Sequence, residues 1–307
     1  GRPSAFFQDA DGVFWIACWD SGLARFDGDR FTTYTTEDGL AGEIVLAILQ
    51  SQDGRLWVGT DGGVSIMESG QITPFVAAGT TQVQAMFEDS RRRLWIGTQA
   101  GGLLQLDGDR LTTFTTSDGL AGGAFADGSP RYEISGIAET GDGDLWFGSC
   151  CGLSRYDGDR FTTYGVRDGL VAVPVNDVEV DGDGGVWVAT DGGVSRYDGT
   201  GFENYTGADG LAQNAASDAF TDRDGNVWIG TGGGLSRFTG HQFLSFTAEQ
   251  AQIGGAVMAV GQDASGIMWF GSWEGVGRFD GDRFTTTDSL AAVGHIWDFF
   301  QDSRGRL

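Results

Sequence analysis

Tryptophan recurs along this chain at a nearly constant spacing, and each copy has the same surroundings. It follows a D-x-x-G-like turn and precedes a corner of small residues, as in "SQDGRLWVGT" at 51–60 and "DRDGNVWIGT" at 222–231. The intervals are 42, 38, 51, 41, 41 and 41 residues, between Trp15, Trp57, Trp95, Trp146, Trp187, Trp228 and Trp269. Self-similarity with a period of about 20–50 residues is the sequence signature of a repeat architecture.

Each repeat contains four short apolar segments. Around Trp57 they are "VLAILQS", "RLWVG", "GVSIME" and "QITPFV", which we name strands A, B, C and D. Four short strands with Gly-rich turns in a period near 42 residues are typical of a β-propeller. One such sheet cannot bury both faces, whereas a ring of sheets packs each on two neighbours. We therefore predict an all-β fold, a seven-bladed β-propeller with four antiparallel strands per blade, as a single domain over 1–307.

The end of the chain repeats its beginning. The segment "DFFQDSRGRL" at 298–307 copies "AFFQDADGVF" at 5–14, so one strand at a terminus is redundant. Either 5–9 or 298–302 can fill the inner position of blade one, and the other would start or extend another blade. Eight blades, or a longer tandem array, is the alternative. Residue 1 lies inside the repeat pattern, so we expect a fragment of a longer chain.

An acidic phrase recurs between successive repeats. "RFDGDRFTTYTTEDGL" at 25–40 returns in altered form at 105–120, 155–170 and 196–211. We interpret "FDGDRF" as strand C, a two-residue Asp-Gly turn of type I′ and strand D, rather than as a catalytic site. Asp9/Asp11 and Asp222/Asp224 resemble the start of a calcium loop that lacks its final bidentate acid. We predict no metal or other cofactor, with Ca²⁺ in these turns as the alternative.

Charge narrows the classes of partner. With 43 acidic against 19 basic residues and a formal net charge of −24, the chain would repel nucleic acid and anionic membranes. No apolar run is long enough for direct membrane insertion by this segment. Its three cysteines lack C-x-x-C spacing, which disfavours zinc. Cys150 and Cys151 are expected to be small buried thiols, with a vicinal disulfide as the alternative.

The phrase "DRDGNVWIGTGGGLSRF" at 222–238, with the linker "TTEDGL" at 35–40, resembles the two-component regulator propeller repeat. The resemblance covers essentially the whole chain. It implies a periplasmic or extracellular sensor propeller that recognises an oligosaccharide and is followed by a transmembrane helix and a signalling module. It supplies no shared catalytic residues. Repeats that depart from the pattern, such as "SRRRLW" at 90–95, are candidate positions for functional residues.

The topology predicts a binding face. The D-to-A links and B-to-C corners share one face of the ring, which we name the mouth face, and the A-to-B and C-to-D turns share the other, the turn face. Most corners are small, but two carry Trp19 with Asp20 and Trp273 with Glu274 on neighbouring blades. Aromatic faces beside carboxylates are a platform for sugar rings. The alternative is that both tryptophans pack on adjacent loops or on a second propeller.

Three further places are candidate ligand contacts. The link at 119–135 is longer than its equivalents and carries Arg131 and Tyr132, although it could merely cover the rim. The final link carries His295 and Trp297. Strand A is expected to present Asp177 and Asp218 to the central channel on adjacent blades, where they would bind a cation or polar ligand, or else backbone amides and water.

Three functions compete. The first is a non-enzymatic sensor propeller that binds an oligosaccharide or other polar small ligand and signals to a downstream two-component module, a second propeller or a homodimer partner. The second is a protein-interaction scaffold in a surface assembly. The third is a lyase-type propeller enzyme, for which a histidine–acid pair on the mouth face would be the discriminating feature.

Overall fold

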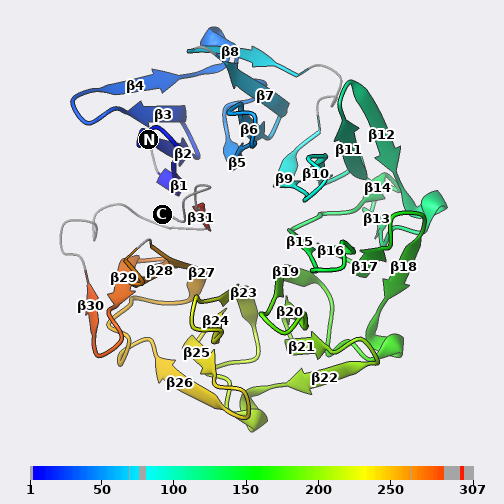
Figure 1. The fold of residues 1–307 in the computed structure, drawn as a ribbon, viewed down its shortest axis with the longest axis vertical. Coiled ribbons are helices and arrows are strands. Elements are labelled where there is room, and N and C mark those ends of the chain that lie inside the picture. The colour runs from blue at the N-terminus through cyan, green and yellow to red at the C-terminus, as the bar shows by residue number, and fades with distance from the viewer. Residues whose placement is uncertain (1–2, 69, 76–80, 264, 287–297, 301–307) are drawn as a thin grey trace.

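A computed structural model of the chain describes residues 3–68, 70–75, 81–263, 265–286 and 298–300. Seven blade sheets stand around a central axis, and in blades two to seven the first strand is innermost (Figure 1). The predicted seven-bladed propeller is therefore confirmed. Among these described residues, no helix is long and apolar enough to cross a membrane.

The first three blades follow the chain in order. Blade one contains β1 (Pro3–Gln8), β2 (Phe14–Cys18), β3 (Gly22–Phe26) and β4 (Phe31–Tyr34). Blade two contains β5 (Val45–Gln50), β6 (Leu56–Thr60), β7 (Gly63–Glu68) and β8 (Gln71–Pro74). Blade three contains β9 (Val83–Glu88), β10 (Leu94–Thr98), β11 (Leu103–Asp107) and β12 (Arg110–Phe114).

The remaining blades repeat this antiparallel order. Blade four contains β15 (Gly136–Glu139), β16 (Leu145–Ser149), β17 (Gly152–Tyr156) and β18 (Phe161–Tyr164). Blade five contains β19 (Val175–Val180), β20 (Val186–Thr190), β21 (Gly193–Tyr197) and β22 (Phe202–Tyr205). Blade six contains β23 (Ala216–Thr221), β24 (Val227–Thr231), β25 (Gly234–Phe238) and β26 (Phe243–Thr247). Blade seven contains β27 (Val257–Gln262), β28 (Met268–Ser272), β29 (Gly275–Phe279) and β30 (Phe284–Thr286).

The redundant strand lies in blade one. The strand β31 (Asp298–Phe300) pairs in parallel with β1, with Ala5 opposite Asp298 and Phe7 opposite Phe300. Thus β1 pairs with β2 as strand A, and its copy adds a fifth strand on the channel side. The sequence left open which copy takes the inner position, and the structure accommodates both in one sheet.

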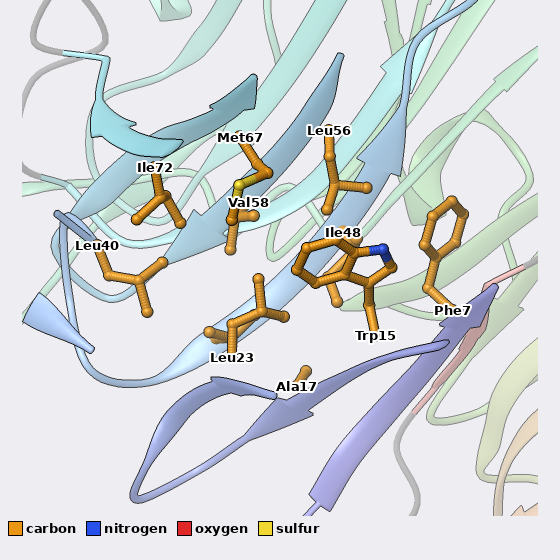
Figure 2. Packing of buried hydrophobic residues seen from close by; sticks show 11 residues of the cluster. Phe7, Trp15, Ala17, Leu23, Leu40, Ile48, Leu56, Val58, Met67 and Ile72 are labelled. Atoms are coloured by element: carbon orange, nitrogen blue, oxygen red, sulfur yellow. The ribbon is translucent and has the colours of Figure 1, made fainter. Parts of the chain in front are cut away.

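The core lies between blades, as radial packing requires. Trp15 and Leu23 of blade one meet Ile48 and Val58 of blade two, while Leu40 of the connecting link closes the outer side (Figure 2). Each is at most 5% exposed. Equivalent clusters fill the five seams from blades two and three to blades six and seven, so burial at each of these seams depends on both blades.

The conserved spacing between the turn and the tryptophan has a direct cause. In six blades the indole Nε1 donates a hydrogen bond of 2.7–3.0 Å to the side chain six residues earlier. The donor–acceptor pairs are Trp15–Asp9, Trp57–Ser51, Trp95–Asp89, Trp187–Asp181, Trp228–Asp222 and Trp269–Asp263. The same carboxylate of Asp9 accepts from the amides of Asp11 and Val13, so it organises the turn from within.

Blade four breaks this rule. Thr140 occupies the acceptor position but donates its hydroxyl to Asp142 and to the Asp144 carbonyl. The buried Trp146 Nε1 has no hydrogen-bond partner among the residues that the structure describes. A buried donor without a partner costs about 1–3 kcal/mol.

We therefore expect Thr140→Asp to stabilise the chain by about 1 kcal/mol, because it restores the acceptor that the other blades have. Urea unfolding followed by tryptophan fluorescence would measure the change. Thr140→Asn supplies a neutral acceptor and separates this gain from repulsion by Asp142 and Asp144. A loss of stability in both variants would contradict the assignment.

The D-G-L phrase of the links is also structural. In the first link Thr35 and Asp38 form a capping box around the 3-10 turn η1 (Thr36–Asp38), and Gly39 follows at φ 113°. Leu40 then enters the core at 3% exposure. The same arrangement recurs at η3 (Thr116–Asp118) and η5 (Gly207–Asp209), whereas η4 (Val166–Asp168) has Gly165 as its N-cap and keeps only the bond from the Gly165 amide to Asp168. The acidic residue caps a turn, and the leucine fixes the link to the blade.

The C-to-D hairpins are confirmed, but the predicted type I′ turn is wrong. In blade one, four residues connect β3 to β4, and only Gly28 has a positive φ, of 99°. The carboxylate of Asp27 accepts hydrogen bonds from the amides of Asp29 and Arg30. An aspartate that bonds its own backbone replaces the second positive-φ residue that a type I′ turn needs.

Candidate ligand-binding face

The corners of the mouth face are closed by a repeated hydroxyl. In blade two, Thr60 Oγ1 donates to the Gly63 carbonyl at 2.8 Å and accepts from the Gly62 amide at 3.2 Å. Thr98, Ser149, Thr190, Thr231 and Ser272 make the same bond to the carbonyl at the start of strand C. The hydroxyl thus holds each of these corners in a tight turn.

Two corners present tryptophan instead. Trp19, between β2 and β3, is 41% exposed, and Trp273, between β28 and β29, is 50% exposed. Asp20 and Glu274 beside them are also exposed. The strand-B tryptophans are buried or half-buried in the blade seams. The structure therefore places two large indole surfaces on solvent-facing corners of neighbouring blades.

The corner of blade seven is supported by the link that precedes it. A Cβ placed on Gly254 would lie 2.1 Å from Glu274 Oε2, so the carboxylate packs directly on this backbone. The Cβ of Trp273 lies 3.6 Å from the corresponding position on Gly255. Link and corner thus form one packed unit at the mouth face, and a side chain at Gly254 would displace Glu274.

The long link forms a hairpin of its own. Its strands β13 (Gly123–Ala124) and β14 (Pro130–Arg131) pair antiparallel. Arg131 bonds Glu133 through its guanidinium, with Nε 2.8 Å from Glu133 Oε2, and lies 5.6 Å from the ring centroid of Phe125. Arg131 therefore remains at the surface with its charge paired.

Tyr132 has a different environment from Arg131. Its side chain is 4% exposed and belongs to the core between blades three and four. Its amide donates to the Gln99 carbonyl at 2.8 Å, and its carbonyl accepts from the Cys150 amide at 3.0 Å. These backbone bonds anchor the link to the corners of blades three and four. Because the side chain of Tyr132 is enclosed, we leave this residue out of the proposed site.

The neighbouring cysteines are free thiols. Burial, aided by a hydrogen bond with Cys151, raises the pKa of Cys150 to about 12. A thiol with such a pKa is largely protonated at neutral pH and is a poor nucleophile.

The channel aspartates join the inner strands. Asp177 Oδ2 accepts from the Ala219 amide of the next blade at 3.1 Å, and Asp218 Oδ2 accepts from the Val260 amide of the blade after it at 2.5 Å. Burial raises the pKa of Asp177, although its hydrogen bond with Asp218 opposes that effect. A bond between two carboxyl groups requires a proton on one of them. The alternative of bonding to backbone amides therefore describes this pair.

Glu179 extends this group and was not singled out by the sequence. Its Oε1 accepts from the Thr221 amide at 2.9 Å. Burial, with the charge of Asp177 adding to it, raises the pKa of Glu179 to about 7. The signal in the sequence was the D-x-E spacing on strand A, which places Asp177 and Glu179 on the same side of the strand.

The histidines and the last predicted ligand contacts form no catalytic group within the residues that the structure describes. His295 and Trp297 lie outside the described residues. His241 is exposed in the C-to-D turn of blade six, on the turn face. Within the described ranges, no group of three or more His, Cys, Asp or Glu side chains is arranged to hold a metal ion.

These features define the chain as a seven-bladed β-propeller with aromatic corners on its mouth face. The family profile described as two component regulator propeller matches three segments of the chain, residues 39–62, 79–100 and 210–233. This confirms the resemblance found in the sequence. Among curated proteins, none is significantly similar in sequence to this chain.

Solved structures share the fold at low identity. The extracellular domain of a hybrid two component system from B. thetaiotaomicron is 18% identical with a TM-score of 0.69, and the match covers 99% of this chain and 49% of that one. A one component system domain from the same organism is 19% identical, with a TM-score of 0.50 and coverages of 92% and 40%. The chain thus spans about half the length of these neighbours or less.

An enzyme also shares the fold. Virginiamycin B lyase from Staphylococcus aureus is 17% identical with a TM-score of 0.60, and the match covers 83% of this chain and 88% of the lyase. The propeller fold is therefore compatible with a binding protein and with an enzyme. Only the side chains of the site can distinguish between these two functions.

Proposed function

We propose that this chain is the extracytoplasmic sensor part of a two-component-type regulator, located in the periplasm or outside the cell. It binds a carbohydrate or a similar polar ligand at its mouth face and passes the signal to a downstream module. The observation that carries the proposal is the pair of exposed tryptophans, Trp19 and Trp273, on neighbouring corners. The repeat family and the fold shared with sensor domains support it.

The chemistry of these corners suits a sugar. An indole face offers apolar, polarizable surface for the C–H side of a pyranose ring, while carboxylates such as Asp20 and Glu274 accept hydroxyl hydrogen bonds. Arg131 on the link hairpin adds a donor, and His295 and Trp297 remain proposed contacts from the final link. Asp177 and Asp218 lie on inner strands, where each accepts a hydrogen bond from a backbone amide of the next blade. We therefore assign them a structural role.

The proposal includes a non-enzymatic role. An elimination or hydrolysis needs a base and an acid held within hydrogen-bond distance of the reacting atoms. The one histidine within the described residues, His241, lies on the opposite face. Ligand binding would act instead by selecting one arrangement of the mouth corners and links.

A thermal-shift screen against plant, algal and bacterial oligosaccharides tests this proposal. A ligand at one hundred times its Kd should add about 2.7 kcal/mol to the free energy of unfolding and raise the Tm by several degrees. We expect a Trp19→Ala, Trp273→Ala variant to lose that shift while it still unfolds cooperatively. Leu244→Ala, an exposed apolar residue on strand D of blade six, is the matched control. A panel without any hit would favour the scaffold function, and a hit unaffected by the double variant would contradict the placement of the site at Trp19 and Trp273.

A further inference from the structure

A cleft lies on the turn face, away from the proposed ligand site. It occupies the seam between blades four and five and has a volume of about 600 Å³. Five aspartates and one arginine contribute charge to its lining, namely Asp142, Asp144, Asp181, Asp183, Asp198 and Arg155. Tyr197 and Trp146 supply aromatic surface. Arg155 pairs Asp144, and Arg196 pairs Asp181. The charges of Asp142, Asp183 and Asp198 make the cleft anionic beside an aromatic wall, which favours a cationic and planar group.

The repeat shows what occupies the equivalent place one seam earlier. Between blades three and four, Arg91 extends from its own turn to the turns of blade four. A Cβ placed on Gly143 would lie 3.7 Å from Arg91 Nη2, and one on Gly158 would lie 3.8 Å from Arg91 Nη1. Arg91 is also close enough to Tyr156 to lower its pKa against the larger effect of burial. A guanidinium of this chain therefore lies against the two glycines of that seam, within electrostatic range of its tyrosine.

The cleft has the same walls without an equivalent of Arg91, while the Arg155 in its lining is paired with Asp144. The tryptophan spacing aligns Gly143, Gly158 and Tyr156 of blade four with Gly184, Gly199 and Tyr197 of blade five. All three equivalents line the cleft. Around Gly184 and Gly199, no described heavy atom lies within 4 Å of an added Cβ. Asp142 aligns with Arg91. The seam between blades four and five therefore has a carboxylate where the preceding seam has a guanidinium, and this carboxylate lines the cleft.

The next seam repeats the arrangement. A second cleft of about 430 Å³ between blades five and six is lined by Gly225 and Gly240, the next equivalents of the two glycines. Asp183, which aligns with Asp142, lines both clefts, as do Asp181 and Gly182. Two neighbouring seats thus share one acidic wall, which suits arginines carried on one polypeptide better than a single small cation.

We propose that the cleft between blades four and five binds the arginine side chain of a partner polypeptide, with the cleft between blades five and six as a second seat. The guanidinium occupies the position that Arg91 holds between blades three and four. It packs on Tyr197 and is paired by Asp142 and Asp183. Guanidinium is preferred over ammonium because its planar fork can stack on the ring while it bonds carboxylate oxygens.

The probes are Ac-Gly-Arg-Gly-NH2 and Ac-Gly-Lys-Gly-NH2, titrated at 0.15 M NaCl while the indole N–H resonances of the protein are followed by NMR. Salt at this level screens the general attraction of the −24 chain for cations. We expect the arginine peptide to bind at least fivefold more tightly than the lysine peptide. We also expect Ac-(Arg-Gly)4-NH2 to bind at least tenfold more tightly than Ac-Gly-Arg-Gly-NH2, because it can occupy both clefts at once. Equal affinity for arginine and lysine would overturn the proposal, and so would the lack of saturable binding.

Variants locate the site. Asp142→Arg gives blade four the residue that blade three has at this position, so it should fill the cleft from within and weaken arginine binding at least tenfold. Asp29→Arg makes the same charge change in an exposed turn of blade one and should leave the affinity within twofold. An equal loss in both would show attraction by net charge alone and overturn the site. If Asp142→Arg does not fold, the isosteric Asp142→Asn, Asp183→Asn variant should still weaken binding about fivefold, and unchanged binding would count against the proposal.

Discussion

Replacing Asp222 with alanine is expected to lower the free energy of unfolding by about 3 kcal/mol. Asp222 is 7% exposed and accepts from Trp228 Nε1 at 2.7 Å, from the Asn226 amide at 2.8 Å and from the Asp224 amide at 3.0 Å. Alanine would leave a buried indole and two turn amides without their charged acceptor. Each such loss costs about 1–3 kcal/mol, and the costs overlap because the turn can relax.

Equilibrium urea unfolding would measure this effect, and the repeat supplies the matched control. Thr140 occupies the same position in blade four but makes no bond to Trp146, so Thr140→Ala should cost less than about 1 kcal/mol. Asp222→Asn keeps one acceptor oxygen and should fall between the two. Equal losses at Asp222 and Thr140 would mean that the turn, and not the bond to the indole, sets the cost.

The fold was predictable because its determinants are local and repeated. The tryptophan and the glycine corner each fix one feature of a blade and recur in all seven blades, while the buried leucine of the D-G-L link recurs in four links. The prediction of a type I′ turn was wrong because the Asp27 carboxylate accepts hydrogen bonds from the amides of Asp29 and Arg30. Residue propensities alone do not reveal such a bond.

The sites were predictable only where a residue departs from its copies. Trp19 and Trp273 stand out against small corners, and both are exposed as a platform requires. Tyr132 also stood out, but the link folds back and buries it between two blades. Glu179 gave little signal, because its raised pKa depends on Asp177 and on the channel that seven blades enclose. Likewise, the clefts of the turn face exist only between blades, so only a comparison of seams shows that they lack an equivalent of Arg91.

The second large effect concerns pH. Burial raises the pKa of Glu179 from its ordinary value of 4.5 to about 7, so the folded state holds a proton that the unfolded chain releases. Between pH 4.5 and 7 the folded state binds more protons, and stability falls as pH rises. Above pH 7 both states are deprotonated at this residue and the loss is complete. By the size of the shift, Glu179 costs the folded chain up to about 3 kcal/mol at pH 8.

Glu179→Gln should remove that cost while its amide oxygen still accepts from the Thr221 amide. We therefore expect the variant to be more stable than the parent by about 2–3 kcal/mol at pH 8, with the difference shrinking steadily toward pH 4.5. Measuring the difference between the two proteins cancels the opposite trend from carboxylates such as Asp181, whose pKa is lowered: burial raises it, but hydrogen bonds from Trp187 and Arg196 outweigh that effect. Glu37→Gln, at an exposed link, should give a flat difference. A flat difference for Glu179→Gln would instead show that Glu179 is ionised at neutral pH, and that the inner strands of blades five and six are held by a solvated carboxylate.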